Sequence, residues 1–248
     1  MIIEKTMNDA WLSNTWLVAD ATAGHGVIVD TGGPMQPILD RVKREHLTIT
    51  HILCTHHHGD HTAHNEDYHR LLGSPVVGHG SERHLFGHLD EEIGEGGIIN
   101  SGDLRIQALH IPGHTMGQLA FLVNDAHVFT GDTLFRRSVG GTRAPGHTTY
   151  EDLRHSIMER LMKLPPHVSV HPGHTDPTTI GEEWEKNPFV RVWRGVDEVR
   201  EESCTAFGQP AILLLGADDY DGGKKCWVRF TRDGKLDIVP GSQVRLPA

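Results

Sequence analysis

The motif Thr55-His56-His57-His58-Gly59-Asp60-His61 constrains the fold more than any other feature of the chain. It follows Ile49 to Cys54, an apolar run that predicts a buried strand. If the strand continued, alternate side chains would share one side. A turn at Gly59 would instead send Asp60 and His61 to a neighbouring position. The motif therefore predicts two pairs of metal ligands at the end of a buried strand, enough to start two adjacent ion sites.

Further donors occur after three other predicted strands. Each directly follows a glycine, and they are His114, Asp132 and His174. Glycine permits tight turns, so the backbone can come close to a metal cluster. Histidine is also frequent, with 20 residues in 248, and imidazole is the commonest nitrogen ligand. Imidazole and carboxylate donors suit zinc, iron or manganese, and the lack of a thiolate among them argues against a structural cysteine–zinc site.

Strands and helices alternate along the first three quarters of the chain, which indicates an α/β protein. Apolar spacing predicts helices over residues 35–46, 63–72 and 150–164, the last with Thr149 as N-cap. A hairpin is expected from Leu119 to Thr130. We expect a main domain at residues 1–190 and a small C-terminal β-rich appendage at 191–248, with strands over residues 210–215, 225–230 and 235–239.

The composition of the chain limits the kinds of molecule that the protein is expected to bind. The formal charge of −10 argues against nucleic acid, because phosphate binding needs a basic surface. No apolar run approaches membrane-spanning length, so no membrane partner is expected. Three dispersed cysteines, Cys54, Cys204 and Cys226, do not suggest a disulfide framework. A reduced, cytoplasmic setting is the expectation.

The motif and its downstream donors resemble the metallo-β-lactamase superfamily, whose HxHxDH signature lies within residues 55–61, beginning at His56. The contexts Pro112-Gly113-His114-Thr115, Gly131-Asp132-Thr133-Leu134-Phe135 and Pro172-Gly173-His174 are similar to the glyoxalase II-like branch, the hydroxyacylglutathione hydrolases. The resemblance covers about residues 12 to 190. It implies an αββα sandwich with metals at the edge between two sheets.

The same resemblance implies a role for each donor. One site would use His56, His58 and His114, the second would use Asp60, His61 and His174, and Asp132 would bridge them. Two divalent ions, with zinc favoured, would turn a shared water into hydroxide near neutral pH. The expected reaction is hydrolysis of a small acyl thioester, with Asp60 and Asp132 as catalytic residues.

Several alternatives stay open. Arg136, Arg137 and Arg143 follow the bridging aspartate and either recognise an anionic substrate or belong to a solvated loop. A mononuclear iron persulfide dioxygenase is the rival enzyme, and a non-catalytic binding module that holds metals structurally is the rival class. The appendage differs from the helical region of glutathione-specific members, so the thiol carrier stays open. Assembly into a homo-oligomer is also left open.

Overall fold

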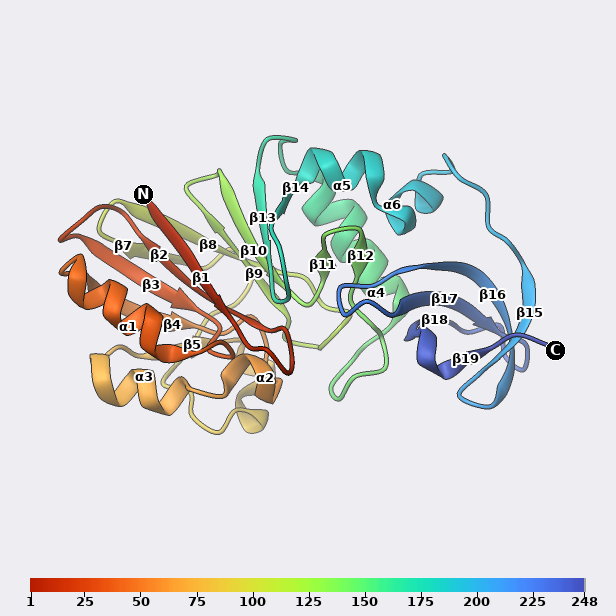
Figure 1. The fold of residues 1–248 in the computed structure, drawn as a ribbon, viewed down its shortest axis with the longest axis horizontal. Helices are drawn as coiled ribbons and strands as arrows, with labels where there is room; N and C mark the ends of the chain where they lie inside the picture. Colours follow the sequence, from red (N-terminus) through yellow and green to blue (C-terminus); the bar gives the residue numbers. More distant parts are fainter. Residues whose placement is uncertain (248) are drawn as a thin grey trace. The chain divides into compact units, whose positions relative to one another are not determined.

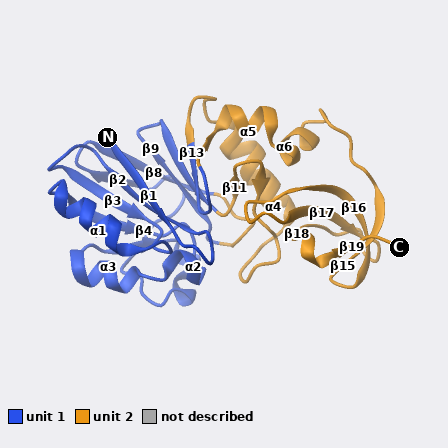
Figure 2. Cartoon of the chain, in the orientation of Figure 1, with its two compact units in different colours: residues 1–110, 117–131, 170–176 blue, residues 111–116, 132–169, 177–248 orange. Residues whose placement is uncertain are grey.

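The computed structural model describes residues 1–247 (Figure 1). The chain divides into two compact units, which Figure 2 distinguishes by colour. Unit 1 holds residues 1–110, 117–131 and 170–176, and unit 2 holds residues 111–116, 132–169 and the chain from Pro177 on. The predicted domain boundary at residue 190 stays a prediction.

The first sheet of unit 1 has the order β1-β2-β3-β4-β5-β6. Its strands are β1 (Ile2–Met7), β2 (Asn14–Ala19), β3 (His25–Val29), β4 (Thr48–Leu53), β5 (Val76–Gly78) and β6 (Glu91–Glu92). The first three pair antiparallel, and β3 to β6 run parallel. Parallel neighbours need crossover connections, which here carry α1 (Met35–Arg44), then α2 (Gly59–Thr62) and α3 (Asn65–Leu72), and then η1 (Gly80–Leu85).

The second sheet of unit 1 has β13, β10, β9, β8 and β7 as consecutive neighbours. Their bounds are β7 (Ile98–Ser101), β8 (Leu104–His110), β9 (Leu119–Val123), β10 (His127–Gly131) and β13 (Ser169–Pro172). The predicted hairpin is confirmed as the antiparallel pair β9–β10. Its turn residues Asn124 and Asp125 have positive φ angles of 49° and 53°, a conformation that Asn and Asp tolerate better than most residues.

Two apolar layers hold unit 1 together. One buried cluster joins the two sheets, with Trp16, Val29 and Leu53 from the first and Phe121 and Phe129 from the second. A separate cluster on the other face of the first sheet packs β-strand residues against α1 and α3, through side chains that include Ile38, Val42 and Tyr68. Unit 1 is thus a helix–sheet–sheet stack, in which β2 is buried along its whole length.

Unit 2 contains the remaining helices. These are α4 (Tyr150–His155), continued by the π-helical η2 (Ser156–Arg160) and the 3₁₀ turn η3 (Leu161–Lys163), then α5 (Ile180–Lys186) and α6 (Pro188–Trp193). The predicted helix over residues 150–164 is therefore confirmed, and the Thr149 side chain accepts a hydrogen bond from the Asp152 amide as its N-cap. The short strands β11 (Leu134–Phe135), β12 (Ser138–Val139) and β14 (Thr178–Thr179) also lie in this unit. Within residues 1–247, no helix has both the length and the apolar character that a membrane crossing requires.

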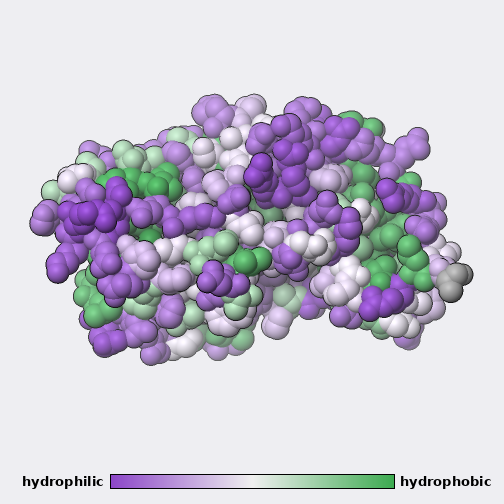
Figure 3. Space-filling view, viewed as in Figure 1, coloured by the Kyte–Doolittle hydropathy of each residue, from purple (hydrophilic) through white to green (hydrophobic). Residues whose placement is uncertain are grey.

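The C-terminal segment of unit 2 forms an antiparallel sheet with the order β18-β17-β16-β15-β19. Its strands are β15 (Glu202–Ala206), β16 (Gln209–Asp218), β17 (Lys224–Phe230), β18 (Leu236–Pro240) and β19 (Val244–Arg245), with the turn η4 (Gly241–Gln243) before the last. The three predicted tail strands are confirmed as β16, β17 and β18, whereas β15 and β19 were not predicted. The sheet encloses a small apolar cluster of its own, and Figure 3 shows further apolar side chains gathered over it. Its Trp227 stacks on Tyr150 of α4 with ring centroids 5.3 Å apart.

Candidate metal centre

The seven candidate donors divide between the two units. His56, His58, Asp60, His61 and His174 lie in unit 1, whereas His114 and Asp132 lie in unit 2. In unit 1 the motif leaves β4 and enters α2, so the chain turns at Gly59 and does not continue as a strand. Of the two arrangements that the sequence allowed, the structure therefore has the turn.

The turn separates the motif's donors into two pairs. His56 Nε2 and His58 Nδ1 lie 2.9 Å apart. Asp60 and His61 lie on α2 and meet His174, with 3.3 Å between the Nε2 atoms of His61 and His174. Asp60 Oδ2 is 3.4 Å from the first of these nitrogens and 3.6 Å from the second. His61 and His174 are fully buried, while the Asp60 side chain keeps about 28% of its surface exposed.

These distances fit a metal ion. Zinc bound tetrahedrally at ~2.0–2.1 Å holds its ligand atoms ~3.3–3.4 Å apart. The three atoms of Asp60, His61 and His174 have nearly that spacing, at 3.3, 3.4 and 3.6 Å. The donor set of two imidazoles and one carboxylate also suits zinc, iron or manganese. The residues present therefore fit a divalent ion.

Asp30, a residue that the sequence reasoning missed, orients this site. Its buried carboxylate accepts hydrogen bonds from the Thr55 amide at 2.8 Å, the Thr55 hydroxyl at 2.8 Å and His61 Nδ1 at 3.0 Å. Because His61 donates from Nδ1, its Nε2 atom carries the lone pair that faces Asp60 and His174. A carboxylate behind a ligating imidazole fixes the tautomer and raises the basicity of the ring. The only signal in the sequence was an acidic residue at the end of a predicted strand, which many surface turns share.

Asn14, also missed, holds the loop that carries His174. Its side-chain amide donates to the carbonyl oxygens of Pro172 and Thr175 at 3.0 and 2.9 Å, and its backbone amide donates to that of Gly173 at 2.7 Å. The Trp16 indole donates to the same Pro172 oxygen at 3.0 Å. The first residues of β2 thus hold the loop of His174 in place through hydrogen bonds.

The two donors of unit 2 lie beside each other. His114 Nε2 is 3.6 Å from Asp132 Oδ2, and His114 Nδ1 is 2.9 Å from the carbonyl oxygen of Gly141. The carbonyl accepts the Nδ1 proton, so Nε2 is left as the ligand atom. Gly113 is required before His114, because at its φ of 147° a Cβ would come within 2.5 Å of the Leu153 backbone.

Glycine is required before Asp132 as well. Gly131 has a φ of 48°, and a Cβ there would lie within 2.5 Å of the Thr55 hydroxyl oxygen. The end of β10 can therefore approach the residue that precedes His56 only because residue 131 lacks a side chain. This confirms, at two of the positions, the predicted reason for the glycines.

Three histidines close in sequence to the candidate donors have contacts of another kind. His57 Nδ1 lies 3.0 Å from Glu82 Oε2, and His110 stacks on His79 with ring centroids 4.5 Å apart. His171 packs between Phe129 and Trp16 at 4.6 and 4.8 Å. Burial, aided by the neighbouring His127, lowers the pKa of His171 to about 3, so the ring is neutral.

The three candidate substrate arginines differ in their surroundings. Arg143 Nη2 forms a 2.6 Å ion pair with the buried Asp237. Arg137 lies 3.7 Å from Glu182 and 3.8 Å from Glu183. The side chain of Arg136 is exposed. Binding of substrate by these residues stays a prediction.

Cys54, which directly precedes the histidine motif, belongs to the apolar core. Cys54 is fully buried, burial raises the pKa of its thiol well above the usual range, and the Asn65 amide donates to its sulfur at 3.2 Å. All three cysteines are free.

Comparison with known proteins supplies the family. Residues 8–174 match the family model of the metallo-beta-lactamase superfamily, and this stretch holds every candidate donor. The chain belongs to the metallo-beta-lactamase superfamily. The predicted αββα sandwich with a C-terminal β appendage is confirmed.

Individual relatives of this superfamily fall in more than one group. A hydroxyacylglutathione hydrolase from Mesorhizobium japonicum is 32% identical over 71% of this chain and 81% of its own length. The crystal structure of ETHE1 from Myxococcus xanthus is 28% identical, with a TM-score of 0.68 over 77% of this chain and 84% of that one. TTHA1623, crystallised in a di-iron-bound form, is 31% identical, with a TM-score of 0.64 over 76% of this chain and 100% of that one. The chain is thus a member of a superfamily of metal-dependent hydrolases and carries His/Asp clusters suited to divalent metals.

Proposed function

We propose that this chain is a binuclear metallohydrolase that cleaves a small acyl thioester. The observation that carries the proposal is the trio Asp60, His61 and His174, whose ligand atoms lie 3.3–3.6 Å apart. A one-ion enzyme that used only the first histidine pair and its partners would not need a second set of donors at ligand spacing. The similarity to a hydroxyacylglutathione hydrolase over 71% of the chain supports the reaction type.

The remaining donors complete the proposal. His56, His58 and His114 would hold the first ion and Asp132 would bridge the two. The 2.9 Å approach of His56 to His58 and the 3.6 Å approach of His114 to Asp132 support these roles. Two divalent ions in such a site lower the pKa of a water shared between them and polarise an acyl carbonyl.

The protein's own groups serve the reaction in distinct ways. Asp60 is the most exposed of the unit 1 trio, at about 28%, so its carboxylate can hold and orient the attacking water. Asp30 keeps the His61 ring in one tautomer through the 3.0 Å bond to Nδ1, and the Gly141 carbonyl does the same for His114 at 2.9 Å. A thiol leaving group, with an ordinary pKa of about 8.5, departs as thiolate and needs no dedicated acid. This favours thioesters over amides as substrates.

Zinc is our proposed native metal, with iron or manganese as alternatives that the donor set also accepts. We further propose a cytoplasmic location, which the three free, buried cysteines support. The substrate would be a small acyl-thiol molecule.

Elemental analysis of protein purified without added metal, followed by thioester and persulfide assays, tests the proposal. We expect two metal ions per chain and release of thiol from acyl thioesters. A single iron per chain with oxygen uptake on a persulfide would establish the rival dioxygenase, and bound metal without turnover of any ester, thioester or persulfide would indicate a binding module.

Two variants give a matched comparison in the same assay. His58→Ala removes a proposed ligand, so we expect it to lose an ion and most of the activity. His64→Ala makes the same change six residues further along, at a partly exposed ring with an exposed fraction near 36%. We expect this control to keep both ions.

A further inference from the structure

A cavity of about 320 Å³ lies within unit 2, between the C-terminal sheet and the loops that carry His114. His114 and the loop residues Gly141, Arg143 and Ala144 line one part of it. The remainder comes from the C-terminal sheet and its connections, including Phe207 and Ile238. Resting on the proposed function, we propose that this cavity is the substrate pocket and that it takes an uncharged, apolar arm of the thioester.

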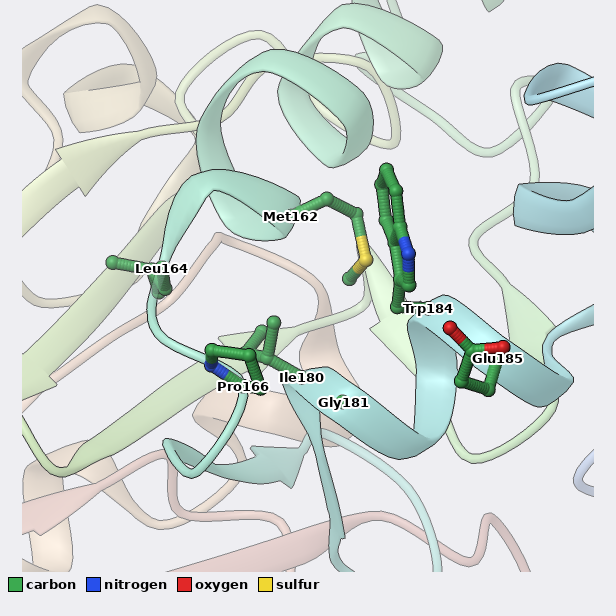
Figure 4. Close-up of a pocket in the computed structure, with 7 residues that line it drawn as sticks. All are labelled: Met162, Leu164, Pro166, Ile180, Gly181, Trp184 and Glu185. Carbon is green, nitrogen blue, oxygen red and sulfur yellow. The ribbon is translucent and has the colours of Figure 1, made fainter.

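The presence of His114 in the lining distinguishes this cavity from a second cavity in unit 2. That second cavity, of about 310 Å³, is formed by α5 and the segment from Met162 to Pro166 and contains no candidate metal ligand. Figure 4 shows Met162 and Trp184 among the side chains that line it. A group bound in the His114 cavity would adjoin a proposed ligand to the first ion, where an acyl carbon must lie to react.

The C-terminal sheet is tied directly to the loop that orients His114. The Thr142 amide donates to the Ile238 carbonyl at 3.0 Å, and the Ile238 amide donates to the Thr142 hydroxyl at 2.9 Å. Thr142 adjoins Gly141, whose carbonyl accepts from His114 Nδ1. The segment from β18 to His114 is thus one hydrogen-bonded chain, and the sheet both walls the cavity and supports the ligand.

The charges of the lining favour an uncharged group. The cavity has two cationic side chains, Arg143 and Lys225. Arg143 forms a 2.6 Å ion pair with Asp237, and Lys225 forms a 2.9 Å ion pair with Asp219; both carboxylates are buried. A substrate carboxylate would have to compete with partners that are already in place, so glutathione, with its two carboxylates, is disfavoured.

The apolar lining and the volume set the expected size of the group. The Arg143 guanidinium also lies over the Phe230 and Phe207 rings at 5.0 and 5.7 Å, which leaves its aliphatic stem and the ring of Phe207 for contact with substrate. The volume is that of roughly ten water molecules at ~30 Å³ each, enough for a short alkyl chain. Burial of one methylene should raise kcat/KM about fourfold.

Two series of thioesters test the pocket and show which arm it takes. One lengthens the acyl group from acetyl to hexanoyl on the uncharged thiol N-acetylcysteamine, and the other lengthens an alkanethiol on an acetyl group. We expect kcat/KM to rise about fourfold per methylene in one series until the cavity is full. We expect a glutathione thioester to be at least roughly tenfold poorer than the N-acetylcysteamine thioester of the same acyl group. No length dependence in either series, or a preference for glutathione, would overturn the proposal.

Substitutions in the lining test whether the dependence of kcat/KM on chain length arises in this cavity. Ala144→Leu fills part of it and Phe207→Ala, at a side chain exposed enough to tolerate the change, removes part of its wall. Both should reduce the dependence on chain length. Ala126→Leu, at the β9–β10 turn and similarly half-buried, is the matched control and should leave it unchanged. A length dependence that neither cavity variant alters would also overturn the proposal.

A binding measurement separates this proposal from the proposed function. Calorimetry with S-alkyl-N-acetylcysteamine thioethers, which cannot be hydrolysed, reports on the pocket alone. These thioethers could bind with the same dependence on chain length, weakened by Ala144→Leu, while no thioester is turned over. That result would support the proposed pocket and contradict the proposed thioester hydrolysis. If thioesters are hydrolysed but thioether affinity does not depend on chain length, the result would support the proposed hydrolysis and contradict the proposed pocket.

Discussion

The substitution Asp30→Asn tests whether a buried carboxylate sets the tautomer of His61. In the wild type one oxygen of Asp30 accepts from His61 Nδ1 at 3.0 Å and from the Thr55 hydroxyl at 2.8 Å, and the other accepts from the Thr55 amide at 2.8 Å. An asparagine side chain has only one oxygen atom to accept the hydrogen bonds that two carboxylate oxygens accept in the wild type. If the oxygen stays at the Thr55 amide, the NH₂ group faces His61 Nδ1 and favours the tautomer with the proton on Nε2.

That proton would occupy the atom that lies 3.3 Å from the Nε2 of His174, where the metal should bind. If the amide flips instead, its NH₂ meets the Thr55 amide, so two donors face each other in a buried place. Loss of an orienting partner behind a metal ligand typically weakens metal binding about 10–100-fold, or about 1.4–2.7 kcal/mol. We expect this loss mainly at the ion held by His61, which contacts Asp30 directly, whereas His56 is linked to Asp30 only through the Thr55 hydroxyl, 3.0 Å from His56 Nδ1.

The measurement is a competition titration of metal-free protein with zinc against a chromogenic chelator. Asp125→Asn provides the control, because Asp125 and Asp30 both have a φ of 53° and the control side chain is exposed in the β9–β10 turn. Equal zinc affinity in wild type and Asp30→Asn would refute the reasoning. So would an equal weakening in the control.

Three further predictions follow from other contacts. Asp132→Ala should lose both ions, because this residue is proposed to bridge them, and metal content after dialysis checks it. His171→Phe removes a ring with a pKa near 3 when folded and about 6.5 when unfolded; the neutral ring's contribution is complete above pH 6.5 and falls below it. Between pH 7.5 and 5.5 the unfolding free energy of metal-free wild type should therefore fall by about 1.4 kcal/mol relative to that of the variant, as measured by urea unfolding. A difference between the two proteins that does not change with pH would contradict this. Asn187→Ala should cost about 2–4 kcal/mol of unfolding free energy, since it removes the α6 cap and the side-chain amide that donates to the buried Glu183 and to the Ser138 carbonyl. A loss below about 1 kcal/mol by denaturant titration would count against this.

Much of the fold could be read from local pattern. The apolar run of β4, the β9–β10 hairpin and the helix after Thr149 depend on residues close together in the chain, as do the tail strands β16 to β18. The tail strand β15 (Glu202–Ala206) lacks this signal, since its sequence Glu-Ser-Cys-Thr-Ala has few large apolar residues. It is a strand because β16 and β19 supply its hydrogen-bond partners.

The sequence by itself determined the superfamily and the seven candidate donors, because ligand type, spacing and a preceding glycine are local properties. Only the tertiary structure showed that Asp30 stands behind His61 and that Asn14 clamps the loop of His174. It alone paired Arg143 with Asp237, two residues far apart in the chain that the sequence offered no reason to join. Each of these contacts is a short, directional bond between distant segments, and its geometry exists only once the sheets have packed. A single sequence records which groups can coordinate, donate or accept, whereas the folded chain decides which of them meet.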